Sequence, residues 1–178
     1  MRKLLPLIAL GLMLAPAARA ATSDNGSAKQ GNAPVFDTYY GGSFGIVDNY
    51  DAAGSDPAWN AGIRYGGVLT DHPWLGAEGE VTDTVHDGNI AGGDFGVRTL
   101  GAYVTLQHNL GPGERTMYLR ARGGYLYERV SIGGAHATDT GLSGGLALGF
   151  PVGKGDLELG ITVVDKHMNF VSVSYLFD

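Results

Sequence analysis

The chain has 178 residues, a formal net charge of −6, 44% hydrophobic residues, 30 glycines, 7 prolines and no cysteine. This length fits a single domain, and the hydrophobic fraction argues against a disordered chain. The lack of cysteine excludes disulfides and thiolate metal sites, and the acidic balance disfavours nucleic acid as a partner.

The first 20 residues have the three parts of a secretory signal peptide. Two basic residues precede an apolar run over Leu4–Leu14, and a small-residue cleavage site ends at Ala20. The run is shorter than the roughly 20 residues that a membrane-spanning helix needs. Removal of residues 1–20 on export would shift the formal charge from −6 to −9. The polar residues 21–35 predict a flexible periplasmic leader.

From residue 36 onward, apolar and polar residues alternate with the period of two that is typical of strands. The alternation predicts eight strands, at approximately Tyr39–Val47, Trp59–Leu69, Trp74–Val85, Thr99–Leu110, Met117–Val130, Thr140–Val152, Leu157–Val164 and Asn169–Phe177. Most of these spans suit the roughly 9–11 residues with which a tilted strand crosses a bilayer.

The connections between the predicted strands alternate in length. Tight turns are expected at 70–73, 111–116 and 153–156, long loops at Asp48–Ala58, His86–Arg98 and Ser131–Asp139, and a short final hairpin at Asp165–Met168. Short turns on one side and long loops on the other are typical of outer-membrane barrels and place both termini in the periplasm. The prediction is therefore an all-β fold, an eight-stranded antiparallel up-and-down transmembrane β-barrel over residues 36–178.

The charged residues of the alternating sets predict which face points inward. They are Arg64, Glu78, Glu80, Arg120, Arg122, Glu128 and Glu158. An arginine facing lipid at mid-membrane would cost about 2–4 kcal/mol, so this face is expected to line the lumen. Because buried charges must be paired, we predict an ion-pair network that plugs the lumen. A narrow polar pore lined by the same residues is the alternative.

Aromatic residues are expected to form two girdles where the barrel meets the membrane interfaces. The predicted periplasmic girdle contains Tyr40, Trp74, Phe150, Tyr175 and Phe177, and the outer girdle contains Trp59, Tyr125 and Tyr127.

Several segments resemble the small outer-membrane β-barrel family that includes the membrane domain of OmpA and OmpX. Trp59–Tyr65 followed by Trp74–Glu80 is similar to the family's Gly-x-Arg-Tyr and Leu-Gly-x-Glu hairpin. Leu119–Tyr125 and Gly141–Gly149 are similar to its fifth and sixth strands. The resemblance covers the chain from Val35 onward and implies a barrel in the bacterial outer membrane, reached through the periplasm.

The C-terminal strand resembles the signal that the barrel-assembly machinery reads. Val171–Phe177 alternates and ends in an aromatic residue, and Asp178 is an addition after it. The resemblance implies this machinery, outer-membrane lipid and lipopolysaccharide as partners. Family members serve as structural proteins, adhesins or resistance factors, so the surface partner stays open.

An enzyme acting on lipid A is the main alternative function. Its candidate residues are His136, Asp139 and either Ser131 or Ser143 around the third predicted loop. Their pattern does not match the motifs of the deacylase or palmitoyl-transferase barrels. We therefore expect a non-enzymatic protein without catalytic residues, with a structural or surface-interaction role carried by its long loops.

Metals, cofactors and a soluble fold were also considered. The five histidines have no close ligand spacing, so no metal and no cofactor is expected. Their positions are His72, His86, His108, His136 and His167. Loop aspartates could form a weak divalent-cation site shared with lipopolysaccharide phosphates; they are Asp48, Asp51, Asp56, Asp87, Asp94 and Asp139. A soluble periplasmic barrel similar to a lipocalin would need its apolar face inside.

Overall fold

The computed structural model describes residues 34–49, 55–90, 93–113 and 115–177. The expected signal peptide, nearly all of the expected leader, Asp51 and Asp178 lie outside the described residues. No helix among the described residues is long and apolar enough to span a membrane.

The described residues from 34 onward fold into a closed antiparallel β-barrel. The strands are β1 (Phe36–Asn49), β2 (Ala58–Leu69), β3 (His72–His86), β4 (Gly88–Ile90), β5 (Gly93–Asn109), β6 (Tyr118–Ile132), β7 (Ala135–Val152), β8 (Gly155–Val163) and β9 (Met168–Phe177). Neighbouring strands follow the order β3-β2-β1-β9-β8-β7-β6-β5, and a β3–β5 pairing closes the wall. The short β4 pairs with β5, and its Asn89 also bridges to Asp56, so β4 is not a further strand of the closed wall. The predicted eight-stranded barrel is confirmed.

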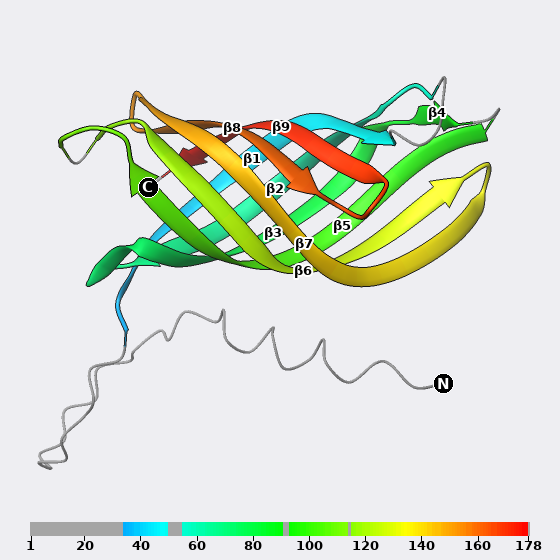
Figure 1. The fold of residues 1–178 in the computed structure, drawn as a ribbon. Helices are drawn as coiled ribbons and strands as arrows, with labels where there is room; N and C mark the ends of the chain where they lie inside the picture. Colours follow the sequence, from blue (N-terminus) through cyan, green and yellow to red (C-terminus); the bar gives the residue numbers. More distant parts are fainter. Residues whose placement is uncertain (1–33, 50–54, 91–92, 114, 178) are drawn as a thin grey trace, which may run out of the picture. The chain divides into compact units, whose positions relative to one another are not determined.

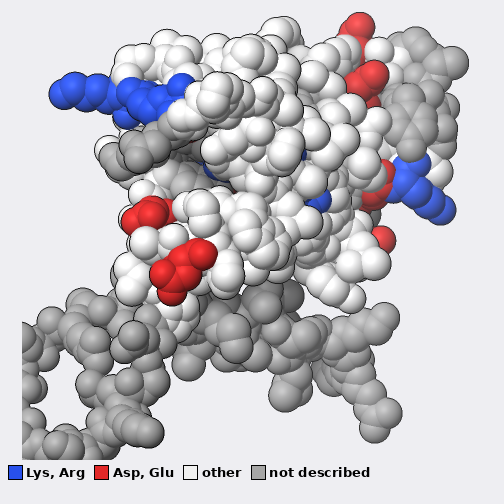
Figure 2. All heavy atoms as spheres, turned by 60° about the vertical axis from the view of Figure 1, so that its left-hand side comes forward, with Lys and Arg blue, Asp and Glu red and all other residues white. Residues whose placement is uncertain are grey.

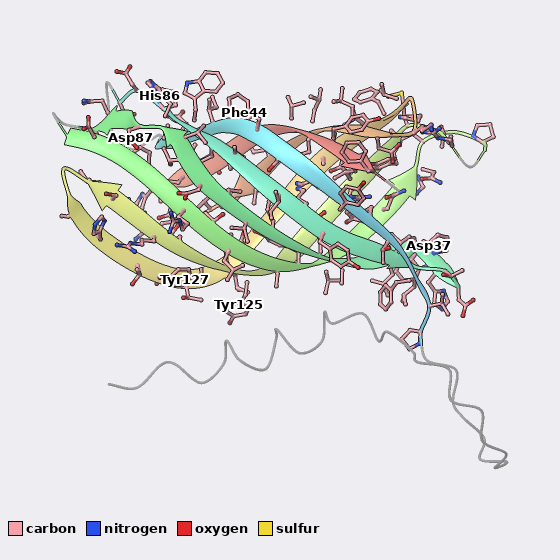
Figure 3. All side chains as sticks on the ribbon, turned by 180° about the vertical axis from the view of Figure 1, so that it is seen from behind. Asp37, Phe44, His86, Asp87, Tyr125 and Tyr127 are labelled. Carbon is pink, nitrogen blue, oxygen red and sulfur yellow. The ribbon has the colours of Figure 1, made fainter. Side chains whose placement is uncertain are left out.

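The barrel has two distinct ends, which we call the terminal end and the loop end (Figure 1). The start of β1 and the end of β9 lie at the terminal end, with the tight β2–β3, β5–β6 and β7–β8 connections. In Figure 3, Asp37 lies at this end, whereas His86 and Asp87 lie at the loop end. In an up-and-down barrel, successive connections between strands lie at opposite ends of the barrel.

Apolar side chains point outward and polar ones inward, as the alternation predicted. On β6, Leu119 and Tyr125 are exposed on the outside, whereas Arg120 and Arg122 are buried. Large hydrophobic residues on the other strands are exposed in the same way, among them Ile63, Val104, Leu146, Leu159, Val171 and Val173. On the face shown in Figure 2, most charged side chains gather toward the two sides of the view and a largely uncharged surface lies between them. This inside-out arrangement suits lipid as the surrounding solvent.

Two of the three predicted long loops are largely strand. Ser131–Asp139 is not a loop, because β6 and β7 stay paired up to Ile132 and Ala135. Gly133 and Gly134 have φ values of 54° and 85°, and a two-residue hairpin turn of type I′ requires positive φ at both positions. The second predicted loop contains β4 and the first residues of β5. The residues of these extensions are mostly small and do not alternate between apolar and polar. The sequence analysis therefore did not recognise them as strands.

The lumen is layered, with charged residues in one part and apolar residues toward the loop end. The apolar cluster comprises Val47, Ala58, Phe95, Val97, Tyr103, Leu126, Val164, Met168 and Phe170. Phe95 and Val97 fell within a predicted loop and Met168 within a predicted hairpin turn, so the sequence analysis assigned no inward face to them. Inward apolar packing toward the loop end is therefore an addition to the predicted polar lumen.

Glycines make room for the large side chains that fill the lumen. A Cβ on Gly149 of β7 would lie 2.1 Å from Cζ of Tyr118, and one on Gly66 would lie 2.7 Å from Cζ of Tyr39. Both tyrosines are buried. Gly149 and Tyr118 are direct partners in the β6–β7 register, so the ring packs flat across the missing side chain.

We predict that Gly149→Ala destabilises the barrel by about 1–3 kcal/mol, because the new methyl group would displace the buried Tyr118 ring. Gly123→Ala is the matched control, since a Cβ there has no atom within 4 Å. The temperature at which the purified barrel unfolds in detergent, followed by its gel shift on heating, measures both. Equal unfolding temperatures for the two variants would contradict the packing argument.

Candidate functional site

The centre of the lumen holds a cluster of arginines and glutamates from four strands, which we call the lumen network. Its members are Arg64 on β2, Glu78 and Glu80 on β3, Arg120 and Arg122 on β6, and Glu158 on β8. All six are buried, with relative exposures between 1% and 9%. The three positive and three negative charges balance.

Arg64 joins the two sides of the barrel. Its Nη1 donates a hydrogen bond to Oε2 of Glu158 at 2.7 Å, and its Nε donates to Oε1 of Glu80 at 3.1 Å. Glu80 is also its direct partner in the β2–β3 register. Glu78 Oε1 lies 3.8 Å from the same Nε. One guanidinium therefore contacts carboxylates on two strands that are not adjacent in the wall.

The two arginines of β6 complete the network from the opposite wall. Arg122 Nη1 lies 2.8 Å from both Glu78 Oε1 and Glu80 Oε2. Arg120 Nη1 lies 2.9 Å from Glu158 Oε1 and 3.8 Å from Glu78 Oε2. Each glutamate thus meets at least two arginines, which is the compensation that buried charges need.

Tyrosines and neutral polar groups bind further atoms of the charged side chains, while Nε of Arg120 has no hydrogen-bond partner. The hydroxyl of Tyr39 donates to Glu78, and that of Tyr118 donates to Glu158, each at 2.9 Å. Arg120 lies over both tyrosine rings, with centroid distances of 4.8 Å and 5.1 Å. Arg120 also donates to Gln107, and Arg122 donates to Thr162 and lies over the ring of Tyr103.

Sequence reasoning did not name these supporting residues. Tyr118 shares the inward parity of Arg120 and Arg122 on β6, and Tyr39 and Tyr103 occupy buried positions in the alternation of β1 and β5. This alternation was the available signal. Tyr118 in particular is adjacent to Arg120 on the same face of β6.

Glu128 lies apart from the lumen network, although it was grouped with it from the sequence. It is inward-facing and 6% exposed, but it follows Arg122 by six residues on β6, about 20 Å along a strand. Its Oε2 has no hydrogen-bond partner. The charged groups that act on Glu128 are Asp165 and Asp139, both acidic. Shared parity predicted the face of Glu128 correctly, but parity says nothing about depth.

Most residues of the expected girdles are exposed on the outside of the barrel. Tyr40, Trp59, Trp74, Tyr125 and Phe177 are 42–59% exposed, whereas Phe150, Tyr127 and Tyr175 are half-buried. At the terminal end, the ring centroids of Tyr40 and Phe177 are 5.2 Å apart, and those of Tyr175 and Phe177 are 4.7 Å apart.

Near the loop end, Trp59 stacks on Phe44 with a centroid distance of 5.3 Å. Tyr125 and Tyr127 point away from the barrel on β6 (Figure 3). Phe44 and Tyr65 are exposed aromatic residues that the sequence analysis did not assign to a girdle.

The candidate residues for lipid A chemistry do not form a catalytic arrangement. His136 and Asp139 lie three positions apart on β7 and therefore on opposite faces. Ser131 is the register partner of His136, whereas the hydroxyl of Ser143 lies on the inner side and donates to the backbone oxygen of Val163. A nucleophile, a base and an orienting acid would need to share one face.

No group of three or more His, Asp or Glu side chains among the described residues could hold a metal ion. Of the loop aspartates, Asp48 belongs to β1, Asp94 to β5 and Asp139 to β7, so these three are strand residues.

Comparisons with known proteins agree on the fold. The family described as "Outer membrane protein beta-barrel domain" matches residues 7–164. Neisserial surface protein A (NspA) matches with a TM-score of 0.55 and 15% identity over 79% of this chain and 94% of that chain. Ail of Yersinia pestis, solved with the heparin analogue sucrose octasulfate, matches with a TM-score of 0.48 and 14% identity over 79% and 96%. No curated protein sequence matches the chain.

We predict that Glu158→Gln destabilises the barrel by about 3–5 kcal/mol, because it removes the nearest carboxylate of two buried arginines, Arg64 and Arg120. Glu128→Gln is the matched control. It removes a buried charge that forms no salt bridge within the described part of the chain, so stability should stay equal or rise. Urea unfolding in lipid vesicles measures both variants. If Glu128→Gln costs as much as Glu158→Gln, the separation of Glu128 from the lumen network is wrong.

Proposed function

The chain belongs to the outer membrane protein β-barrel domain family and lies in the bacterial outer membrane, and from that premise we propose a closed, non-enzymatic barrel. In this proposal the barrel serves as a rigid membrane anchor. Its loop end faces the outside of the cell and carries a structural or surface-interaction role.

The lumen network is the main observation that supports a closed barrel. Its side chains reach across the barrel from β2 and β3 to β6 and β8, and the residual cavity beside them has a volume of about 10 Å³. That volume is about the space of one water molecule. Toward the loop end, the packed apolar cluster adds a layer that would repel hydrated ions. Both layers support a plug and argue against a pore.

The same two layers argue against a ligand-binding lumen. A site for a small molecule needs a pocket of roughly 300–1,000 Å³. The larger hollow, of about 680 Å³, lies on the outside of the barrel, between lipid-facing residues such as Phe44, Leu146 and Ile161. Acyl chains of the surrounding membrane are the natural occupants of such an apolar surface. Any selective interaction is therefore expected at the loop end.

The basic residues at the loop end are the expected contacts for lipopolysaccharide phosphates. Arg129 and Lys166 are exposed there. Arg98 is also exposed, but its Nη2 lies 2.5 Å from Oδ2 of Asp83, so its charge is already partly neutralised. Together with the apolar belt, these positions support a general lipid contact that has no specificity for one lipid.

Assembly is expected to use the C-terminal strand. β9 pairs with β1 and β8 and closes the first and last strands of the chain against each other. Val171, Val173 and Phe177 are exposed on its outer face. An exposed alternating strand with a near-terminal aromatic residue is the feature that the barrel-assembly machinery would read.

We predict that the purified protein gives no steady ion current in a planar lipid bilayer, because the lumen network and the apolar cluster block the path. A general porin inserted under the same conditions is the positive control. Protein recovered from the bilayer material must still show the folded gel mobility. A steady current from the folded wild-type protein would refute the closed barrel and favour the narrow pore.

The absence of enzyme activity has a separate test. Incubation of the folded barrel with lipopolysaccharide, followed by mass spectrometry of lipid A, should show unchanged acyl chains. A gain or loss of an acyl chain that disappears in His136→Ala would overturn the non-enzymatic proposal.

A further inference from the structure

The outside of the barrel is uneven where β1, β8 and β9 meet. The stacked rings of Phe44 on β1 and Trp59 on β2 are 49% and 42% exposed, and we call this pair the aromatic ridge. Next to it is the hollow of about 680 Å³ on the outer surface, which we call the outer hollow. The outer hollow lies over β8 and β9, between the aromatic ridge and the leucines of β7; its lining includes Leu146, Leu148, Leu159, Ile161, Val171 and Val173.

The aromatic ridge and the outer hollow lie along the same rows of the sheet. Phe44 is the register partner of Val173, and Trp59 pairs with Ile46, which in turn pairs with Val171. Two barrels inserted in the same direction can be related by a two-fold axis along the membrane normal. Such an axis between β1 and β9 brings the ridge of each barrel opposite the hollow of the other. This is the self-complementary surface that a two-fold symmetric interface needs.

The wall of the barrel is shortest on the same face. β8 has 9 residues and β9 has 10, whereas the flanking β7 and β1 have 18 and 14. Figure 1 shows the β8–β9 hairpin ending short of the β6–β7 hairpin. With 9 residues at about 3.3 Å each and a tilt of about 35–45°, β8 rises roughly 21–24 Å. The apolar band of such barrels is about 25 Å tall, so lipid beside β8 must thin, and oligomerisation relieves a mismatch of this kind.

The composition of this face permits close approach of another protein surface. The outward positions of β8 and β9 carry apolar side chains, one asparagine and two aromatic residues, and no charged side chain. Gly45, Ala147, Gly160 and Ser172 contribute small groups to the lining of the outer hollow. Within a membrane, where lipid is as apolar as the protein, close packing over small residues is what holds segments together.

We propose that a second copy of this chain docks on this face, so that two barrels form a two-fold symmetric dimer within the membrane. The aromatic ridge of each copy lies in the outer hollow of the other. Because both copies use the same surface, the association ends at two. The dimer goes beyond the proposed anchor role, since it places two loop ends side by side outside the cell.

The same observations favour a second copy over other occupants of the outer hollow. Acyl chains fill it in the single barrel, but mobile chains do not make the dense contacts that two fixed aromatic rings make. Acyl chains also leave the short wall of β8 in contact with lipid. A different membrane protein would need a matching ridge at the same depth, which the second copy has by symmetry.

Position-specific cross-linking tests the contact directly. The chain has no cysteine, so one introduced thiol reports on one position. Val173→Cys lies beside the proposed two-fold axis, and Val104→Cys on β5 lies on the opposite wall; the two valines are 48% and 57% exposed. The full mature protein is diluted into lipid vesicles and oxidised with copper phenanthroline. Val173→Cys should become a covalent dimer, whereas Val104→Cys should stay at the level of random collisions.

Two variants of the proposed contact test its shape. Phe44→Ala removes half of the aromatic ridge, and Val173→Trp fills the outer hollow without removing the ridge. Each should weaken association about tenfold or more, as loss of an aromatic anchor does at protein interfaces. Energy transfer between barrels labelled at the N-terminus measures association in vesicles. Val104→Trp is the matched control and should associate like the wild type, and the gel shift on heating verifies that each variant is folded.

Three results would overturn the inference: equal cross-linking of Val173→Cys and Val104→Cys, a monomer at every ratio of protein to lipid, or equal association of folded Val173→Trp and the wild type. A monomer throughout would leave acyl chains as the occupants of the outer hollow. The closed barrel is tested separately, because the bilayer current depends on the lumen and these measurements depend on the outer face.

Discussion

The balance of charge inside the barrel is the constraint on which the rest of this structure depends. An arginine such as Arg64 cannot face acyl chains without a large cost, and it cannot be buried alone. The contact with Glu158 on the far wall satisfies both conditions, because it places the charge inside and pairs it there. Once the charged face is inside, the apolar face of every strand must meet lipid, and the wall must close around the network.

Sequence reasoning recovered the fold because alternation is a local property. The parity of Arg120, Arg122 and Glu158 was readable, and it assigned the inward face correctly. The depth of each residue was not readable, because depth depends on strand tilt and register across the whole barrel. Glu128 was therefore grouped with charges from which it is separated. The hairpin turn at Gly133 was also not recognised, because the small residues before Asp139 do not alternate between apolar and polar.

The interior of the barrel and its loop end differ in how completely they are packed and paired. The lumen network and the apolar cluster fill the interior, so the wall is supported from within and little space remains beside the network. At the loop end, β7 extends past the last residue of β8, and no described strand pairs with that edge over residues 135–143. The unpaired carboxylate of Glu128 lies on the inner side of that hairpin. Buried charges need partners, and Oε2 of Glu128 has no hydrogen-bond partner among the described residues.

The most direct test of the central claim is a double-mutant cycle between Arg64 and Glu158, measured as unfolding free energies in lipid vesicles. Each glutamine variant removes one side of a 2.7 Å contact between strands that lie far apart in the sequence. We predict that the double variant Arg64→Gln/Glu158→Gln is less destabilised than the sum of the single variants, with a coupling of about 0.5–3 kcal/mol. Strict additivity would show that the two side chains do not stabilise the barrel through each other and would contradict the account.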